Sequence, residues 1–127
     1  RSQMAEGWAR HLKSDSIQAF SAGLEAHGLN LNAVEVMQES GVDITSQKSQ
    51  KVEEVETIPF DFVITVCGHA DEYCPVFSCS TTVVHIGFDD PPKLAENAKT
   101  EEEALNHYRR VRDEIRTFVE TLPKVLW

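Results

Sequence analysis

Two stretches of the chain place apolar residues at helical spacing, one near each end. The first has its apolar face on Met4, Ala5, Trp8 and Leu12. It predicts a helix that begins at residue 1 or 2, with Ser2 as the residue able to cap it. The second follows TEEE at residues 100–103, which has the form of a capping box with an acidic first turn. The long amphipathic helix predicted there, ended by Pro123, has its apolar face on Leu105, Tyr108, Val111, Ile115, Phe118, Val119 and Leu122.

Between these helices the pattern changes to short apolar runs. Residues 16–22 (SIQAFSA), 60–66 (FDFVITV) and 81–86 (TTVVHI) are predicted strands. The run at 60–66 is nearly all apolar and β-prone, which is typical of a buried parallel strand. A short helix is predicted between the first two strands, with Asn30 as its N-cap and Gly41 at its end. Its apolar face is expected to consist of Leu31, Val34 and Met37.

The remaining segments are short and polar. Residues 42–45 are predicted to be extended, 47–56 to include a short helix, and 87–99, rich in Pro, Asp and Asn, to form a loop. Helices and strands therefore alternate along the chain, which predicts an α/β fold with a mainly parallel sheet. Because no repeat or low-complexity tract divides the sequence, residues 1–127 are expected to form a single domain.

In such a sheet, ligands bind beyond the carboxyl ends of the strands. Cys67 directly follows one predicted strand, residues 87–91 follow another, and residues 21–23 end the first. We expect these three segments to lie at one edge of the sheet, together with the start of the first helix.

Composition narrows the possible functions. The 127 residues carry a net charge of −9, which argues against nucleic-acid binding because phosphate neutralisation needs a basic face. No apolar run approaches the ~20 residues of a membrane span, and no signal peptide is visible. Three cysteines, an odd and low number, fit a reducing compartment. A cytoplasmic protein without membrane association is therefore predicted.

Several short motifs occur in the order in which one known family has them. They are RSQMAEGW at residues 1–8, SAG at 21–23 followed by AHG at 26–28, the pair Cys67 and Cys74, and GFDDP at 87–91. In these motifs the chain resembles thioredoxin-coupled arsenate reductases, which have the low-molecular-weight protein tyrosine phosphatase fold. The resemblance runs from Arg1 to the last helix, and it implies a three-layer fold and thioredoxin as the electron-donating partner.

The resemblance also implies a segment that precedes Arg1. The family begins with a strand and an anion-binding loop of the pattern C-x5-R-S, of which this sequence contains Arg1 and Ser2. The nucleophilic Cys is therefore expected six positions before Arg1, and the natural protein is expected to extend N-terminally by a strand and that loop, a span of ~15 residues. Residues 1–127 alone are expected to be unstable and not to turn over arsenate.

Further roles follow from the same resemblance. Arg1 would grip two oxygens of arsenate, or of phosphate or sulfate as mimics, because a guanidinium binds oxyanions in a bidentate manner. Ser2 would donate a hydrogen bond to the thiolate of the nucleophile. Asp90, directly before Pro91, would be the general acid that protonates the leaving oxygen, and Asp89 is the neighbouring alternative.

Cys67 and Cys74 are implied to act in sequence. Cys67 would attack the arseno-thiol adduct and release arsenite, and Cys74 would then attack Cys67, so that the final disulfide is reduced by thioredoxin. In a helix, Cα atoms seven residues apart lie ~10.5 Å apart along the axis, whereas a disulfide needs about 4.4–6.8 Å. Residues 67–74 are therefore predicted to rearrange on oxidation. Cys79 is expected to be a passive thiol.

A potassium ion is the candidate cofactor. Glu6 and Ser21 match positions that help to bind potassium in some family members. Gln50 stands where those members have an Asp, which weakens the match. No other metal is expected.

Three other interpretations remain open. A low-molecular-weight protein tyrosine phosphatase would share Arg1 and Asp90, but Pro92-Lys93 stands where those enzymes have tandem Tyr. A metal-binding module could use the potential ligands Cys67, His69, Cys74, Cys79 and His85, although their spacing lacks a zinc knuckle. A non-catalytic binding protein is the third.

Overall fold

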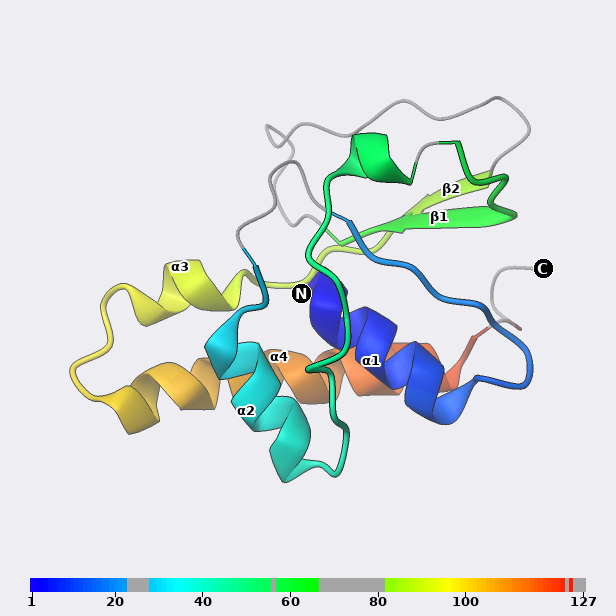
Figure 1. The fold of residues 1–127 in the computed structure, drawn as a ribbon. Helices are drawn as coiled ribbons and strands as arrows, with labels where there is room; N and C mark the ends of the chain where they lie inside the picture. The colour runs from blue at the N-terminus through cyan, green and yellow to red at the C-terminus, as the bar shows by residue number, and fades with distance from the viewer. Residues whose placement is uncertain (23–27, 56, 67–81, 123, 125–127) are drawn as a thin grey trace.

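The computed structural model describes residues 1–22, 28–55, 57–66, 82–122 and 124. Helices α1 (Ser2–Leu12), α2 (Leu31–Glu39) and α4 (Glu101–Glu120) lie to one side of strands β1 (Phe62–Thr65) and β2 (Thr82–His85) in Figure 1. A short helix, α3 (Pro91–Ala95), precedes α4, and a 3-10 turn covers Val52–Glu54. This is the predicted α/β architecture.

The two strands are parallel neighbours, with Phe62 opposite Thr82 and Thr65 opposite His85. The parallel pairing confirms the prediction, although β1 is shorter than the apolar run 60–66 that indicated it, and β2 ends one residue before the end of its run. The side chains of β1 are half-buried rather than buried, and Thr82, Val83 and His85 of β2 are exposed. Ile64 of β1 is one of the partly buried residues that pack against the helical core.

Helix α4 organises the core because it contacts α1, α2 and α3. Figure 1 shows it running beneath α1 along much of the molecule. The predicted apolar face of α4 is confirmed at Leu105, Tyr108, Val111, Ile115 and Val119, which are all buried. On the facing elements, the fully buried side chains include Met4, Trp8, Val36, Met37 and Ile44. Burial of these large apolar surfaces is the main force that holds the helices together.

The predicted capping box of α4 is present with one variation. The Thr100 hydroxyl accepts a hydrogen bond from the Glu103 N–H at 3.1 Å. The Glu103 carboxylate reaches one residue further back than in the usual box and accepts from the Lys99 N–H at 3.2 Å. The helix ends at Glu120, and Pro123 lies outside the described residues.

The predicted ends of α2 are correct, but its predicted face is not. The Asn30 side chain accepts from the N–H groups of Asn32 and Ala33, and Gly41 has the positive φ of 81° that follows many helix ends. Leu31, expected on the apolar face, is 80% exposed. The buried residues are Ala33, Val36 and Met37. The error arose because the sequence of α2 allows an apolar face that includes Leu31 or one that includes Val36. Packing against α4 determines which of the two faces is buried.

Helix α1 was predicted with the correct start but the wrong cap. Its N-cap is Arg1, which makes no side-chain capping bond, and Ser2 is the first helical residue. Arg1 cannot cap because a guanidinium has no acceptor atom. The Arg1 side chain instead makes the contacts of the candidate functional site described below.

Residues 16–22 do not form the predicted strand. Ile17, Ala19 and Ser21 point inward and alternate with exposed residues, as in a strand, but no described strand pairs with this segment. Side chains bind its carbonyls instead: Arg10 donates to the Ala19 oxygen at 3.2 Å, and Gln50 donates to the Ser21 oxygen at 3.0 Å. The side chains of this segment therefore alternate between inward and exposed positions, as in a strand, but the segment has no ladder of backbone hydrogen bonds to a described strand.

Three other local predictions concern the segments that connect the main elements, and one of them needs correction. Residues 87–99 are not simply a loop, because Pro91 begins α3, a position that proline favours since it has no N–H to satisfy. Residues 42–45, predicted to be extended, belong to no helix or strand, and Val42 and Ile44 are buried. A short helix was predicted within 47–56, and a 3-10 helix forms there at Val52–Glu54.

Candidate functional site

Arg1 lies where the first helix meets the carboxyl ends of both strands. Its Nη1 atom donates to the Phe88 carbonyl at 3.0 Å and to the Val66 carbonyl at 3.3 Å. Val66 follows β1, and Phe88 lies beyond the end of β2. The structure thus confirms that the start of α1 and these two strand ends meet at one edge. The Arg1 side chain is 14% exposed, so its charge lies in a largely enclosed position.

Asp90 faces this arginine. Its Oδ1 atom lies 3.6 Å from the Arg1 Nε atom, and its side chain is 31% exposed. The Asp90 carboxylate is therefore paired with a cation and still partly open to solvent. Asp90 and Arg1, which lie far apart in sequence, are brought together as predicted.

The backbone around Asp90 keeps its carboxylate available. Asp90 is the N-cap of α3 yet makes no side-chain capping hydrogen bond. An Asp at this position ordinarily accepts from the N–H of the second or third helical residue. Pro91 and Pro92 occupy the first two positions and have no N–H. The tandem prolines therefore remove the nearest competitor for the carboxylate.

Asp89, the alternative acid, points to another partner. Its Oδ2 atom accepts from Arg110 Nη2 of α4 at 2.9 Å, and its side chain is 63% exposed. Arg110 also binds Glu114 at 2.9 Å. The geometry therefore separates the two adjacent acids, and it is Asp90 that lies at Arg1.

Ser2 and Ser21 line a polar hollow beside the start of α1. The hollow has a volume of about 90 Å³. Its other lining residues are Gln3, Ala22, Lys48, Ser49 and Gln50. Ser2 is thus near the candidate potassium residues, and the hollow is small and polar, with a lysine on its wall.

Glu6 is a buried carboxylate with a donor on each oxygen. The Ser21 hydroxyl donates to Oε1 at 2.6 Å, and Arg10 Nε lies 2.8 Å from Oε2. Glu6 is 5% exposed. Gln50 points its amide N–H, rather than an acceptor, at the Ser21 carbonyl. The candidate potassium residues are therefore neighbours, but their donor set does not fit a cation, because Arg10 already supplies the positive charge.

Gln3 is a site neighbour that the sequence did not single out. Its Oε1 accepts from the Asn30 N–H at 3.1 Å, and its Nε2 donates to the Gly28 oxygen at 3.2 Å. Gln47 in turn donates to the Gln3 carbonyl at 2.9 Å. These bonds fasten the segment before α2 to the first turn of α1. No periodic pattern marks such a residue, since its partners are backbone groups distant in sequence.

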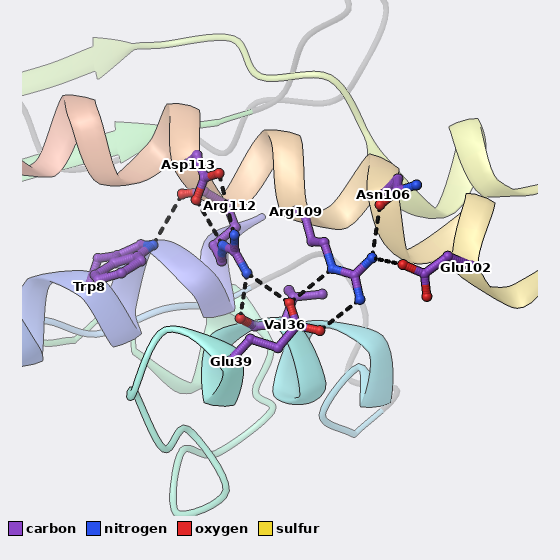
Figure 2. A network of polar contacts seen from close by, with 8 residues as sticks. All are labelled: Trp8, Val36, Glu39, Glu102, Asn106, Arg109, Arg112 and Asp113. Carbon is purple, nitrogen blue, oxygen red and sulfur yellow. Dashed lines mark hydrogen bonds and ion pairs between the residues drawn. The ribbon is translucent and has the colours of Figure 1, made fainter.

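A second feature that the sequence did not reveal is an ion network between α2 and α4 (Figure 2). Glu39 accepts from Arg109 at 2.8 and 2.9 Å and from Arg112 at 3.1 Å. Hydrogen bonds from Arg109, followed by those from Arg112, lower the pKa of Glu39. Arg112 also donates to the Val36 carbonyl in the last turn of α2 at 2.9 Å, where a cation complements the helix dipole.

The same network ties α1 to α4 and continues along α4. The Trp8 indole N–H donates to the Arg112 carbonyl at 3.1 Å. Arg109 further binds Asn106 at 2.8 Å and pairs with Glu102. These contacts support the helices that carry Arg1 and Arg110, and they lie away from the candidate acid.

Most of the cysteine chemistry lies outside the described residues. Cys67, Cys74, Cys79 and His69 are among these, so their predicted roles and the predicted rearrangement of residues 67–74 stay predictions. Of the ligands considered for a metal module, only His85 is described, and its Nδ1 lies 2.5 Å from the Thr65 hydroxyl oxygen. In the described part of the chain, no group of three or more His, Cys, Asp or Glu residues is placed to hold a metal ion.

No helix within the described residues combines the length and apolarity that a membrane crossing needs.

Comparison of the sequence with known proteins points to one family. The family described as low molecular weight phosphotyrosine protein phosphatase matches residues 1–126. An arsenate reductase from Halalkalibacterium halodurans is 48% identical over 125 residues, spanning 95% of this chain and 88% of its own. An arsenate reductase from Bacillus subtilis is 47% identical over 115 residues, spanning 91% of this chain and 81% of its own.

Solved structures agree. An arsenate reductase in the phosphate binding state superposes with a TM-score of 0.77 at 30% identity, covering 95% of this chain and 86% of that one. An arsenate reductase in the oxidized state superposes with a TM-score of 0.78 at 29% identity, covering 99% and 89%. Both the sequence and the fold of this chain are thus similar to those of arsenate reductases.

Proposed function

The chain belongs to the low molecular weight phosphotyrosine protein phosphatase family, as an arsenate reductase, and we propose that it works by a relay of cysteine thiols around Arg1 and Asp90. The observation that carries the proposal is the meeting of Arg1, Asp90 and the Val66 carbonyl at one edge of the sheet. Val66 is the last described residue before Cys67 in the sequence, so the chain leads to the candidate thiol directly from a residue that contacts the oxyanion-binding cation.

Arg1 binds the substrate in this proposal. Arsenate is a tetrahedral oxyanion, and a planar guanidinium can donate to two of its oxygens at once. The hydrogen bonds of Arg1 to two carbonyls fix its position before substrate arrives. The phosphate-bound relative makes phosphate a natural mimic and competitor.

Asp90 acts as the general acid. Attack of a first thiolate on arsenic expels an oxygen, which leaves as water once it has been protonated. The product is an arseno-thiol adduct. The family pattern C-x5-R-S assigns this first thiolate to a cysteine six positions before Arg1, and Ser2 stabilises the thiolate by donating a hydrogen bond.

Cys67 then completes the reduction. Its thiolate attacks the sulfur of the adduct, so a disulfide forms, the sulfur–arsenic bond breaks and its electron pair reduces arsenic to arsenite. Cys74 next attacks Cys67 and releases the first cysteine as a thiol. Two electrons and two protons from thioredoxin, acting in a reducing cytoplasm, return the Cys67–Cys74 disulfide to its thiols.

The test is arsenite production by the full-length gene product with thioredoxin, thioredoxin reductase and NADPH. Cys67→Ser and Cys74→Ser are expected to abolish multiple turnovers, whereas Cys79→Ser, the matched control, is expected to keep them. Arsenite production that survives Cys67→Ser would refute the relay.

An aryl-phosphatase activity is the second candidate, because phosphate resembles arsenate and the family is named for phosphatases. Robust hydrolysis of aryl phosphate without arsenite production would favour it. Pro92 and Lys93 offer no aromatic ring to stack on a phenol, so we expect this activity to be minor.

We further propose that no potassium ion is needed. Arg10 neutralises Glu6, and the Ser21 hydroxyl already donates to the same carboxylate. Replacing potassium by sodium at constant ionic strength is therefore expected to leave arsenate turnover unchanged. A specific rise in activity with potassium would contradict this.

A further inference from the structure

Two adjacent acids after β2 are held by cations from two different helices. Arg110 of α4 binds Asp89 at 2.9 Å, and Arg1 at the start of α1 lies 3.6 Å from Asp90. Asp90 has an extended backbone, with φ −91° and ψ 105°. Successive side chains in extended backbone point in opposite directions. Fixing the direction of Asp89 therefore also fixes the direction of Asp90.

Arg110 is well placed to serve as a fixed point. It lies within the 20-residue helix α4, next to Val111, which is 0% exposed. Glu114, one turn further along α4, binds Arg110 Nη1 at 2.9 Å and so holds the guanidinium from its other side. The hydrogen bonds with Asp89 and then Glu114 raise the pKa of Arg110.

Helix α4 also fixes the position of Arg1, because it packs against α1. Helices α1 and α4 are in contact, and the Trp8 indole donates to the Arg112 carbonyl at 3.1 Å. Both cations are thus positioned relative to α4. Because Pro91 and Pro92 supply no N–H for capping, nothing at the first two positions of α3 draws the Asp90 carboxylate back to the helix.

We propose that Arg110 is a positioning residue for arsenate reduction: by holding Asp89 against α4, it turns Asp90 towards Arg1 and the substrate oxyanion. Arg110 itself touches neither substrate nor thiol and acts through Asp90. The inference rests on the proposed function, in which Asp90 protonates the oxygen that leaves arsenic.

The kinetic test compares Arg110→Ala with the wild-type full-length protein. An exposed ion pair can contribute up to about a five-fold effect, so we expect kcat to fall by about three- to five-fold while the KM for arsenate stays unchanged, since Arg1 is intact. Arg110→Lys is expected to recover part of kcat because it keeps the charge. Glu120→Gln is the matched control: it breaks another exposed i,i+4 ion pair of α4, with Arg116 at 2.9 Å, that involves neither acid, and it is expected to behave as wild type.

A double-mutant cycle distinguishes positioning from a merely structural role. In an Asp90→Asn background there is no acid left to position, so adding Arg110→Ala is expected to change kcat no further. An equal loss of kcat in both backgrounds, or no loss in either, would overturn the proposal.

A measurement that needs no catalytic turnover tests this inference independently of the proposed function. The side-chain Nε–H resonance of Arg1, followed by NMR in the reduced, substrate-free protein, reports the nearby Asp90. Asp90→Asn sets the reference shift, and Arg110→Ala is expected to move the resonance in the same direction, whereas Glu120→Gln leaves it in place. Absence of arsenite production by the wild type would refute the function alone, and an unmoved Arg1 resonance in Arg110→Ala would refute the positioning role.

Discussion

Replacing Gly7 with alanine tests how closely α1 is packed against the chain after α2. Gly7 is buried in the middle of α1. A Cβ atom there would lie 2.6 Å from Ile44 Cγ2, 3.1 Å from Met37 Cε and 3.3 Å from Gln47 Oε1. Favourable carbon–carbon contacts lie at about 3.5–4.0 Å. The contact with Ile44 is therefore a true overlap.

Two opposing effects set the expected magnitude. Alanine is favoured over glycine within a helix by about 0.5–1 kcal/mol. Overpacking a core costs about 1–3 kcal/mol, and the upper part of that range applies because Ile44 and Met37 are both 0% exposed. Met37 Cε is the end of a flexible chain and can move aside, but Ile44 Cγ2 is attached to Cβ and can move only with its backbone or by an unfavourable rotamer. A net destabilisation of about 1–2 kcal/mol is expected.

Urea unfolding followed by far-ultraviolet circular dichroism measures this change, provided that the m-value is unchanged. Ile44→Leu removes the Cγ2 methyl at a cost expected to stay below about 1.5 kcal/mol. If the overlap is the cause, Gly7→Ala in the Ile44→Leu background should cost at least about 0.5 kcal/mol less than in the wild type.

Gly41→Ala is the matched control. Gly41 has a φ of 81° and no atom within 4 Å of an added Cβ, so alanine there introduces backbone strain of about 1–2 kcal/mol without a clash. Its cost should be the same in the Ile44→Leu background. A Gly7→Ala protein more stable than wild type would refute the close packing and would mean that helix propensity outweighs the overlap.

The other predictions concern the acid, the ion network and the buried carboxylate. Asp90→Asn is expected to lower kcat for arsenate by about 10²- to 10⁴-fold as a lost general acid, and steady-state kinetics should show a far smaller fall for Asp89→Asn; equal falls would contradict the assignment. Because hydrogen bonds from Arg109 lower the pKa of Glu39 below its ordinary 4.5, Glu39 contributes stability above that pH. The contribution is lost as the pH falls through the lowered pKa, so Glu39→Gln should destabilise the protein at pH 7 by at most about 1 kcal/mol, given its exposure, and urea titrations of the two proteins should converge in acid. Ser21→Ala removes a donor from a buried carboxylate and should cost about 1–3 kcal/mol in the same assay, with Ser21→Thr as a control that keeps the hydroxyl.

The helices show what local sequence can determine. The capping residues Asn30 and Thr100 were predictable because a short polar side chain before an apolar stripe binds N–H groups only a few residues ahead. The buried face of α4 was predictable because its stripe is long enough to leave one orientation. For α2, with nine residues, two orientations fit, and Leu31 was placed on the wrong side.

The candidate site shows the same division. The motifs around Arg1 and Asp90 indicated both residues, and the carboxyl-end rule indicated that they would meet. The resemblance assigned the acid role to Asp90, with Asp89 as the alternative, but the cation that each acid reaches across the fold could not be read from the sequence.

By itself, then, the sequence determined the α/β class, the parallel strand pair, the starts of α1, α2 and α4, and the family motifs, since each depends on residues close together in the chain or on their regular spacing. Only the tertiary structure decided that Ser21 donates to Glu6, that Gln3 fastens the segment before α2, that residues 16–22 pair with no described strand, and that Arg110 holds Asp89. These features depend on partners that are distant in sequence, and only the folding of the whole chain brings those partners within hydrogen-bonding distance.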